Sequence, residues 1–149
     1  LLVDLVEEWE PRFDNAGLIL HSELDRCDPL HGDKEALRDA FSNLLDNALK
    51  YHRASCPDPQ ATIRLSQEGR NAFIEVEDNG LGVPPEKRKG IFERFSRVEG
   101  PGRGKAGGHG LGLSFAREAI VLHKGTITCK DGLSGGACFS VRIPISARR

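Results

Sequence analysis

The chain has 149 residues, about the length of one domain, and its 21 basic and 22 acidic residues nearly cancel. The near-neutral charge argues against a dedicated nucleic-acid-binding protein, and no apolar run approaches the ~18 residues of a membrane-spanning helix. Methionine is absent, so we expect the chain to be part of a longer protein.

The first half of the chain is predicted to form a helix, a strand and a second helix. Apolar residues near helical spacing predict a helix over residues 1–15, and alternating polarity predicts a strand over residues 18–24. After a loop over residues 25–32, Asp33 is a typical N-cap residue, and the helix that follows keeps one apolar face as far as Tyr51.

The second half combines two hairpins with one further helix. Residues 63–66 and 72–77 are predicted strands joined by a four-residue turn, 68–71, and Pro84-Pro85 begins a short helical piece. Seven glycines between Gly100 and Gly112 disfavour regular structure, because glycine loses the most backbone entropy on ordering. A helix with a cationic last turn and a glycine stop, then two strands, complete the chain: residues 111–123, 125–131 and 137–144.

This order of elements predicts the fold class. Because hairpins dominate, we expect a single α+β domain over residues 1–149, with about three helices packed on one face of a mixed, mostly antiparallel sheet. The sequence contains no internal repeat and no linker long enough to divide it into two domains.

The four cysteines do not form a metal or redox motif, because no two are spaced as Cys-x-x-Cys and no histidine lies at zinc-finger spacing. Cys129 and Cys138 lie on two predicted strands and could face each other across a hairpin. We favour four reduced thiols in a cytoplasmic protein.

The helix that ends near Tyr51 has a polar face. Asn43 and Asn47 are four residues apart and Lys50 is three further on, so all three lie on one side of the helix. Carboxamide oxygens suit Mg²⁺, and a lysine can bind a phosphate. The alternative is a solvated helix face on which Asp46 pairs with Lys50, although asparagine is a poor residue for the middle of a helix.

A carboxylate ends the second strand of the first predicted hairpin. Asp78 is followed by Gly80 and Gly82. The carboxylate could accept a hydrogen bond from an exocyclic amine such as that of adenine, and the glycines would let a flat ring approach the backbone. The alternative is a tight turn, because Asp-Asn-Gly is favourable turn chemistry.

The glycine-rich segment leads directly into a predicted helix, an arrangement that can bind an anion through backbone N–H groups. It is not a P-loop, because Glu99 stands at the first position of that pattern and Ala106 replaces the Ser or Thr that would bind Mg²⁺. A dinucleotide-binding fold is excluded because the preceding βαβ unit is missing. A disordered loop is the alternative, and it is compatible with a lid over phosphates.

An aromatic pair, Phe92 and Phe95, precedes the glycines and encloses Arg94, with Arg97 just beyond. Residues 86–105 carry seven basic and three acidic side chains, so this side of the protein is locally positive. The arginines could contact a phosphate or a partner. The alternative is a small apolar cluster with solvated arginines.

These four stretches, in this order, resemble the N box, first glycine box, F box and second glycine box of the catalytic ATP-binding domain of sensor histidine kinases. That family belongs to an ATPase superfamily shared with gyrase, heat-shock chaperones and mismatch-repair proteins. The resemblance spans nearly the whole chain, from about Leu1 to Ile145. The Phe-Glu-Arg-Phe run, residues 122–125 and Gly135-Gly136 before Phe139 favour the kinase branch.

The resemblance implies a site for ATP and Mg²⁺. Asn47, with Asn43 beside it, matches the metal-coordinating asparagine, and these two with Lys50 are the residues implied to act in catalysis. Asp78 matches the aspartate that hydrogen-bonds the adenine amine. The other residues implied to contact the nucleotide are Lys50, Tyr51, Gly80, Gly82, Arg94, Arg97, Gly108, His109, Gly110, Leu111 and Gly112.

The resemblance also implies a protein-histidine kinase of a two-component system. The γ-phosphoryl of ATP would pass to a histidine on a separate phosphoacceptor and dimerisation domain, and then to a response regulator. Residues 1–15 would follow that domain, and residues 98–109 would form the ATP lid. We expect a cytoplasmic, monomeric domain of a homodimeric protein that can be anchored in the inner membrane, with no nucleic-acid partner and no autophosphorylation by this chain alone.

Two other functions stay open. One is a serine kinase of the anti-sigma type, against which the F box and the lid argue. The other is a non-catalytic nucleotide-binding or docking module, against which Asn47, Asp78 and the glycines argue. Ala137-Cys138 stands where many members of the family carry Ser or Thr, which puts any hydroxyl contact near the adenine in doubt.

Overall fold

The fold consists of a sheet layer and a helix layer. The structure is a computed structural model, and it describes all residues except 54, 95–111, 133–134 and 146–149. In chain order its helices and strands are α1 (Leu2–Asn15), β1 (Ile19–Leu24), α2 (Lys34–Lys50), β2 (Gln60–Glu68), β3 (Asn71–Asp78), α3 (Gly112–Leu122), β4 (Thr126–Asp131) and β5 (Ala137–Pro144). Two short 3₁₀ turns, η1 (Pro85–Lys87) and η2 (Gly90–Phe92), lie between β3 and α3.

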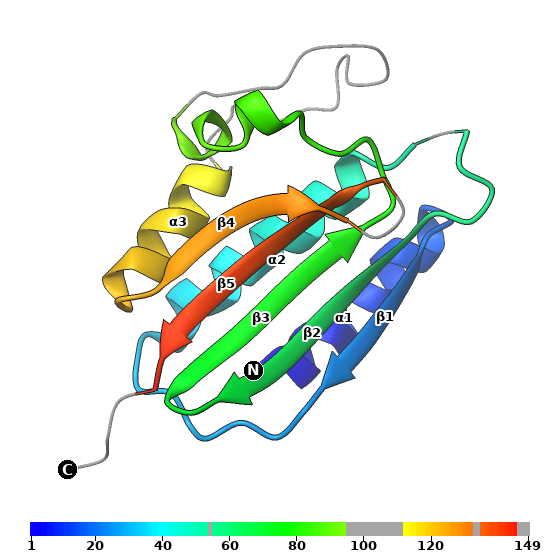
Figure 1. The fold of residues 1–149 in the computed structure, drawn as a ribbon. Coiled ribbons are helices and arrows are strands. Elements are labelled where there is room, and N and C mark those ends of the chain that lie inside the picture. The colour runs from blue at the N-terminus through cyan, green and yellow to red at the C-terminus, as the bar shows by residue number, and fades with distance from the viewer. Residues whose placement is uncertain (54, 95–111, 133–134, 146–149) are drawn as a thin grey trace.

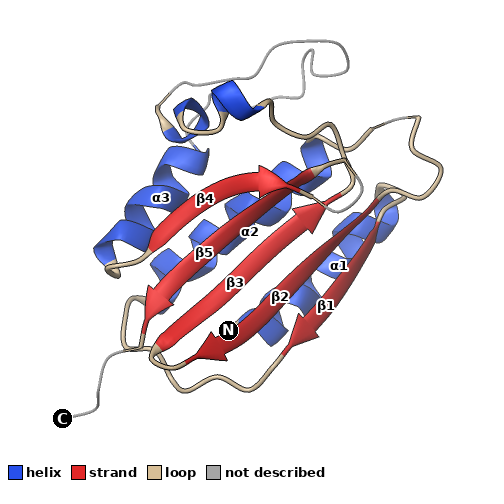
Figure 2. Cartoon of the chain, viewed as in Figure 1, coloured by secondary structure: helices blue, strands red, loops and turns tan. Residues whose placement is uncertain are grey.

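The five strands form one sheet in the order β1-β2-β3-β5-β4 (Figure 1). The β1–β2 pair is parallel, because α2 carries the chain back across the sheet between them, and the other three pairs are antiparallel. All three helices lie on the same face of this sheet (Figure 2). The predicted mixed, mostly antiparallel sheet with helices on one face is confirmed.

The sequence pattern explains both layers. Asp33 caps α2 as predicted, since its Oδ1 accepts hydrogen bonds from the backbone N–H groups of Glu35 and Ala36, both at 3.1 Å. Alternate residues of β3 are buried, and this period of two also turns the last one, Asp78, toward the helix layer. Within the described residues, no helix is long and apolar enough to cross a membrane.

The turn between β2 and β3 is shorter than predicted. The strands extend to the facing pair Glu68 and Asn71, so only Gly69 and Arg70 form the turn, instead of four residues. Gly69 has a φ of +59°, the sign that a two-residue type II′ turn requires at its first position. The prediction missed this because Glu68 and Asn71 are polar residues that are typical of turns.

Cys129 and Cys138 do not face each other across the β4–β5 hairpin, the arrangement that the sequence had left open. In the β4–β5 register Cys129 lies opposite Phe139 and Cys138 opposite Lys130, so the two thiols lie on opposite faces of the sheet. All four cysteines are free thiols, as favoured from the sequence. Burial raises the pKa of the Cys129 thiol to about 11 and that of Cys138 to about 12, which keeps both protonated and unreactive at neutral pH.

Helix α3 ends on a left-handed lysine and not on the predicted glycine. Lys124 has a φ of +62°, and its N–H donates to the carbonyl of Val121 at 2.9 Å. Gly125 is needed for a different reason: a Cβ there would overlap the carbonyl oxygen of Arg142 on β5. Close approach of two backbones, and not a positive φ, therefore explains this glycine.

We expect Lys124→Gly to raise the free energy of unfolding by about 0.5 kcal/mol, because relief of the left-handed strain exceeds the added chain entropy. The matched control is Lys89→Gly, since Lys89 has right-handed helical angles and the same change there should lower stability. Urea unfolding followed by the fluorescence of Trp9, the single tryptophan, gives both values. Equal destabilisation by the two variants would contradict the strain at Lys124.

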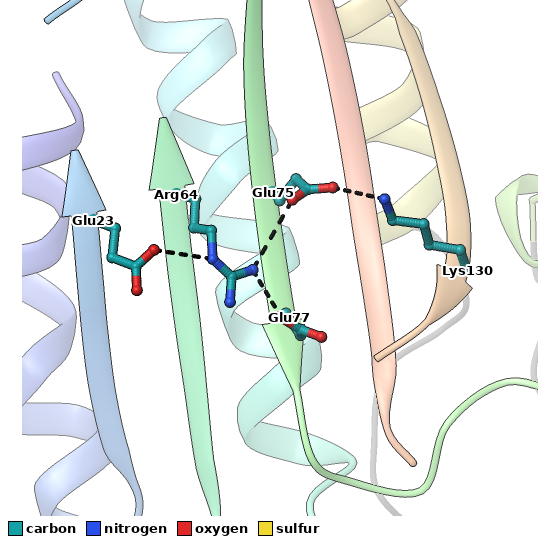
Figure 3. Close-up of polar contacts among 5 residues, drawn as sticks. All are labelled: Glu23, Arg64, Glu75, Glu77 and Lys130. Atoms are coloured by element: carbon teal, nitrogen blue, oxygen red, sulfur yellow. Dashed lines mark hydrogen bonds and ion pairs between the residues drawn. The ribbon is translucent and has the colours of Figure 1, made fainter. Parts of the chain in front are cut away.

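The sheet face that the helices leave uncovered carries a row of charges (Figure 3). Arg64 on β2 bonds Glu23 on β1 at 3.1 Å and Glu77 on β3 at 2.8 Å. Lys130 on β4 lies 2.9 Å from Glu75 on β3, and this bond holds the pKa of the Glu75 carboxyl below its ordinary value. The row therefore stabilises the folded sheet at neutral pH, and the Glu75 contribution is lost as the pH falls through that lowered pKa.

Candidate functional site

The end of β3 holds a buried carboxylate. Asp78 is only 8% exposed, and among the described residues it is the single charged or polar residue classed as buried. Its Oδ1 accepts hydrogen bonds from the backbone N–H of Gly80 at 2.8 Å and from that of Ala137 at 3.3 Å. A carboxylate held by backbone donors keeps a fixed orientation in apolar surroundings, where a hydrogen bond is electrostatically stronger than in water.

Glycines allow three backbone segments to meet around Asp78. A Cβ at Gly80 would overlap the carbonyl oxygen of Tyr51, and a Cβ at Gly136 would overlap that of Asp78 itself. Gly82 has a φ of +71°, and a Cβ there would lie 2.9 Å from the carbonyl oxygen of Gly135. The glycines that follow Asp78 thus serve backbone-to-backbone packing in this structure.

The end of α2 is bonded to the segment after β3. The N–H of Leu81 donates to the carbonyl of Tyr51 at 3.0 Å, and Nε of Arg53 donates to the carbonyl of Asn79 at 3.2 Å. The side chain of Asn79 in turn accepts from the N–H of Gln60 at 2.9 Å. These bonds bring two predicted site residues, Tyr51 and Asp78, to the same end of the sheet.

The polar face of α2 is present as predicted, and its members have different partners. Nδ2 of Asn43 donates to the carbonyl of Gly112, the first residue of α3, at 3.1 Å. Asn47 is half-buried one turn further along the helix. Lys50 pairs with Asp46 at 2.9 Å, as in the alternative considered from the sequence, and both side chains are more than a third exposed. An exposed pair of this kind contributes little to stability.

A second bond ties α2 to α3 at their other ends. Nε2 of His123 accepts a hydrogen bond from the backbone N–H of Asp33 at 2.9 Å, and its Nδ1 lies 2.7 Å from the carbonyl oxygen of Ala119. A Cβ at Gly32 would overlap the imidazole ring, so the glycine makes room for it. The polar face of α2 is therefore fixed relative to the start of α3.

The remaining predicted site residues lie at or beyond the edge of the described structure. Arg94 is exposed, and its guanidinium carbon lies 5.9 Å from the ring centroid of Phe115 on α3. Gly112 begins α3 next to Asn43. The other predicted residues, and the predicted lid at 98–109, lie outside the described residues: Arg97, Gly108, His109, Gly110 and Leu111.

Comparison with known proteins identifies the family to which this arrangement belongs. Residues 32–147 match the family described as histidine kinase-, DNA gyrase B-, and HSP90-like ATPase. The chain is a member of this ATPase family. The match covers both α2 and the Asp78 region, which confirms the resemblance noted in the sequence.

Curated relatives of this chain include sensor kinases. Sensor histidine kinase RppB of Synechocystis sp. is 35% identical over 146 residues, which cover 97% of this chain and 32% of RppB. Sensor protein CiaH of Streptococcus pneumoniae is 39% identical over 113 residues, which cover 76% of this chain and 25% of CiaH. The chain thus spans about a third or less of these relatives.

Solved structures confirm the fold of this chain. The mycobacterial sensor histidine kinase MprB superposes with a TM-score of 0.76 at 26% identity, over 97% of this chain and 92% of that one. Full-length ShkA in complex with AMPPNP superposes with a TM-score of 0.83 at 25% identity, over 99% of this chain and 30% of that one.

The sequence placed Ala137-Cys138 near the adenine only as a missing hydroxyl contact, and it assigned no site role to the backbone that packs against Asp78. The N–H of Ala137 bonds its carboxylate, and Gly132 and Gly136 pack against its backbone. The sequence signal that could have revealed this contact is the number of glycines between β4 and β5, which is larger than a turn requires. Arg88, which bonds both neighbouring segments, gave no signal, because its partner Asp131 is distant in the sequence.

Proposed function

We propose that this chain is the ATP-binding catalytic domain of a two-component sensor histidine kinase. In this proposal it binds Mg-ATP and passes the γ-phosphoryl group to a histidine on a separate domain of a longer protein. The observation that carries the proposal is the buried carboxylate of Asp78, held by two backbone N–H groups, in a member of an ATPase family. The AMPPNP complex of the similar kinase ShkA supports nucleotide binding.

Adenine recognition is assigned to the end of β3. Asp78 accepts a hydrogen bond from the exocyclic amine of adenine, Gly80 and Gly82 shape the pocket, and Tyr51 lies beside the purine. The short distances from Gly80 and Ala137 to Oδ1 support this assignment, because they orient the carboxylate before a ligand arrives. A preoriented acceptor loses little entropy on binding.

The phosphates and the metal are assigned to the polar face of α2. Amide oxygens are hard donors that suit Mg²⁺, and Asn47 and Asn43 supply two of them on one helix face. With its amide nitrogen bonded to Gly112, Asn43 keeps its oxygen for a ligand. Lys50 exchanges Asp46 for a phosphate at low cost, because their exposed pair is weak. When bound, Mg²⁺ neutralises part of the phosphate charge.

In this proposal the chain positions the phosphoryl group for transfer, and the acceptor lies on another domain. Phosphoryl transfer depends mainly on alignment and charge neutralisation, which the assigned residues provide. Both ring nitrogens of His123 are engaged, and Nδ1 of His52 lies 2.7 Å from the carbonyl oxygen of Leu49, so neither histidine is suited to accept a phosphoryl group. These contacts exclude two of the five histidines, and the proposal assigns the acceptor histidine to another domain.

The proposed arrangement of the full-length protein follows, because the catalytic domain and the acceptor histidine are assigned to different domains. Residues 1–149 form the catalytic domain, residues 1–15 follow the phosphoacceptor and dimerisation domain, and residues 98–109 act as the lid. The full-length protein is a homodimer that signals to a response regulator from the cytoplasm, with an inner-membrane anchor as one arrangement. Sensor kinases about three times as long as this chain among its relatives support a multidomain protein.

The test is transfer of label from γ-phosphate-labelled ATP with Mg²⁺. We expect acid-labile label on a separately purified histidine-bearing domain of the full-length protein when this chain is added, and none on this chain alone. Asn47→Ala should slow the transfer at least ~100-fold, because metal and phosphates lose a ligand.

The matched control for this test is Asn71→Ala. Asn71 lies at the start of β3 and bonds Arg142, away from α2 and Asp78, so its variant should transfer label at the parent rate. Acid-labile label on this chain alone would show that the acceptor is not on another domain. Acid-stable label on a serine would indicate a serine kinase instead.

A further inference from the structure

Arg88 connects the two segments that flank Asp78. It follows η1 and is half-buried, with its side chain 21% exposed. Its Nε donates to the carbonyl of Val83 at 3.0 Å, within the segment that continues from β3. Its terminal nitrogen lies 2.5 Å from Oδ1 of Asp131, the last residue of β4. One guanidinium group therefore bonds a backbone carbonyl on one side and a carboxylate on the other.

On the β4 side, the contacts lead directly to the carboxylate of Asp78. The residue after Asp131 is Gly132, whose N–H donates to the carbonyl of Gly136 at 2.9 Å. A Cβ at Gly132 would lie 2.8 Å from the carbonyl oxygen of Asp78. Ala137, the residue after Gly136, donates its N–H to Oδ1 of Asp78. The end of β4 is thus in contact with the backbone that orients this carboxylate.

On the β3 side, the residue before Val83 packs against the same turn. A Cβ at Gly82 would lie 2.9 Å from the carbonyl oxygen of Gly135 and 3.4 Å from that of Gly136. The backbones of the two segments therefore approach closely at this point, where three glycines meet. A change in their separation moves the N–H of Ala137 relative to Asp78.

We propose that Arg88 is a positioning residue for the nucleotide base: by bonding Val83 and Asp131 it sets the distance between the two segments that hold the Asp78 carboxylate. This inference rests on the proposed function. Arginine suits the role because its planar fork directs two donors at fixed angles, which a lysine ammonium group does not. Asp131 is 82% exposed, so the ion pair adds little to global stability and its effect is local.

The test compares Arg88→Ala with Arg38→Ala in the 149-residue chain. Arg38 also pairs with a carboxylate, that of Glu8, but it links α2 to α1 away from Asp78. By calorimetry, Arg88→Ala should weaken binding of AMPPNP and of ADP by about the same factor, roughly tenfold, because both share the base. Arg88→Lys should recover part of the affinity through Asp131, and Arg38→Ala should leave it within about twofold.

A second measurement needs no nucleotide. Amide hydrogen exchange of the unliganded chain should be faster at Gly132 and Ala137 in Arg88→Ala than in the parent, and unchanged there in Arg38→Ala. Thermal unfolding of both variants should stay close to that of the parent. Together, amide exchange and thermal unfolding distinguish a local loss of structure from unfolding of the whole chain.

Each outcome decides the matter. Unchanged exchange at Gly132 and Ala137, or unchanged affinity in Arg88→Ala, overturns the positioning role. A loss confined to AMPPNP overturns it too, because it would indicate a contact with the terminal phosphate. A parent chain that binds neither nucleotide contradicts the proposed function. Faster amide exchange in Arg88→Ala would then show that Arg88 holds the β4–β5 turn in place without a role in base recognition.

Discussion

Replacing Asp78 with asparagine is expected to abolish measurable nucleotide binding while the chain stays folded. The asparagine oxygen can still accept the N–H groups of Gly80 and Ala137, so the backbone around it is retained. The NH₂ group of the asparagine then replaces the second carboxylate oxygen, so that a hydrogen-bond donor faces the amine of adenine, which is also a donor. The loss of a charged acceptor and the clash of two donors should weaken binding about 100-fold or more.

Calorimetry with AMPPNP measures this loss, and the fluorescence of Trp9, far along the chain on α1, reports whether the fold persists. Asp14→Asn, an exposed position near the end of α1, is the control for the charge change. An Asp78→Asn variant with the parent affinity would remove Asp78 from the base pocket. A variant that unfolds would mean that the carboxylate is mainly structural.

Gly136→Ala is expected to lower the free energy of unfolding by about 3 kcal/mol and to abolish binding. The added Cβ would overlap the carbonyl oxygen of Asp78 and lie 2.6 Å from both its carbonyl carbon and its Oδ1. These atoms belong to paired strands or accept hydrogen bonds, so they have little room to shift. The clash must therefore separate the start of β5 from the end of β3.

Gly90→Ala is the matched control for this prediction, because no atom lies within 4 Å of a Cβ built at Gly90 and its φ is not positive. Urea titration of both variants compares their midpoints. Equal midpoints would contradict the close approach of the β4–β5 turn to Asp78.

Much of the fold was predictable because periodicity and end signals are local properties of the sequence. Apolar spacing and Asp33 predicted α2 to within one residue at its end, and the strand predicted over residues 72–77 is β3, which extends one residue further at each end. The sheet order and the parallel β1–β2 pair required the structure, because strands separated by a helix can pair in more than one order.

Details that depend on two backbones meeting were not predictable. The β4–β5 register, which places Cys129 opposite Phe139, was not predictable because the length of the turn between the two strands was unknown. The positive φ at Lys124 was missed because the next residue is glycine, which the sequence pattern favours as the helix stop. Pairing with β5 sets the position of Cys129, and close approach to Arg142 on β5 explains the glycine at position 125; β5 comes later in the chain than both residues.

The structure shows where the candidate site residues lie, while their roles toward a nucleotide stay predictions. Tyr51 is bonded to the segment that follows Asp78, and Asn43 is bonded to the first residue of α3. The pairing of Lys50 with Asp46 was an open alternative that the structure contains. Arg88 could not be found from the sequence, because its role depends on Asp131, which is brought near only by the completed sheet.

The parallel β1–β2 pair has a consequence for the order in which the sheet assembles. The β2–β3 hairpin closes through two residues, so its contacts form after a small loss of chain entropy. Strand β1 reaches β2 across the α2 crossover, and β5 pairs with β3 across an even longer stretch of sequence, so both contribute the non-local contacts that slow folding. The backbone of the hairpin that ends in Asp78 is thus expected to form early, with β1 and β5 joining it later.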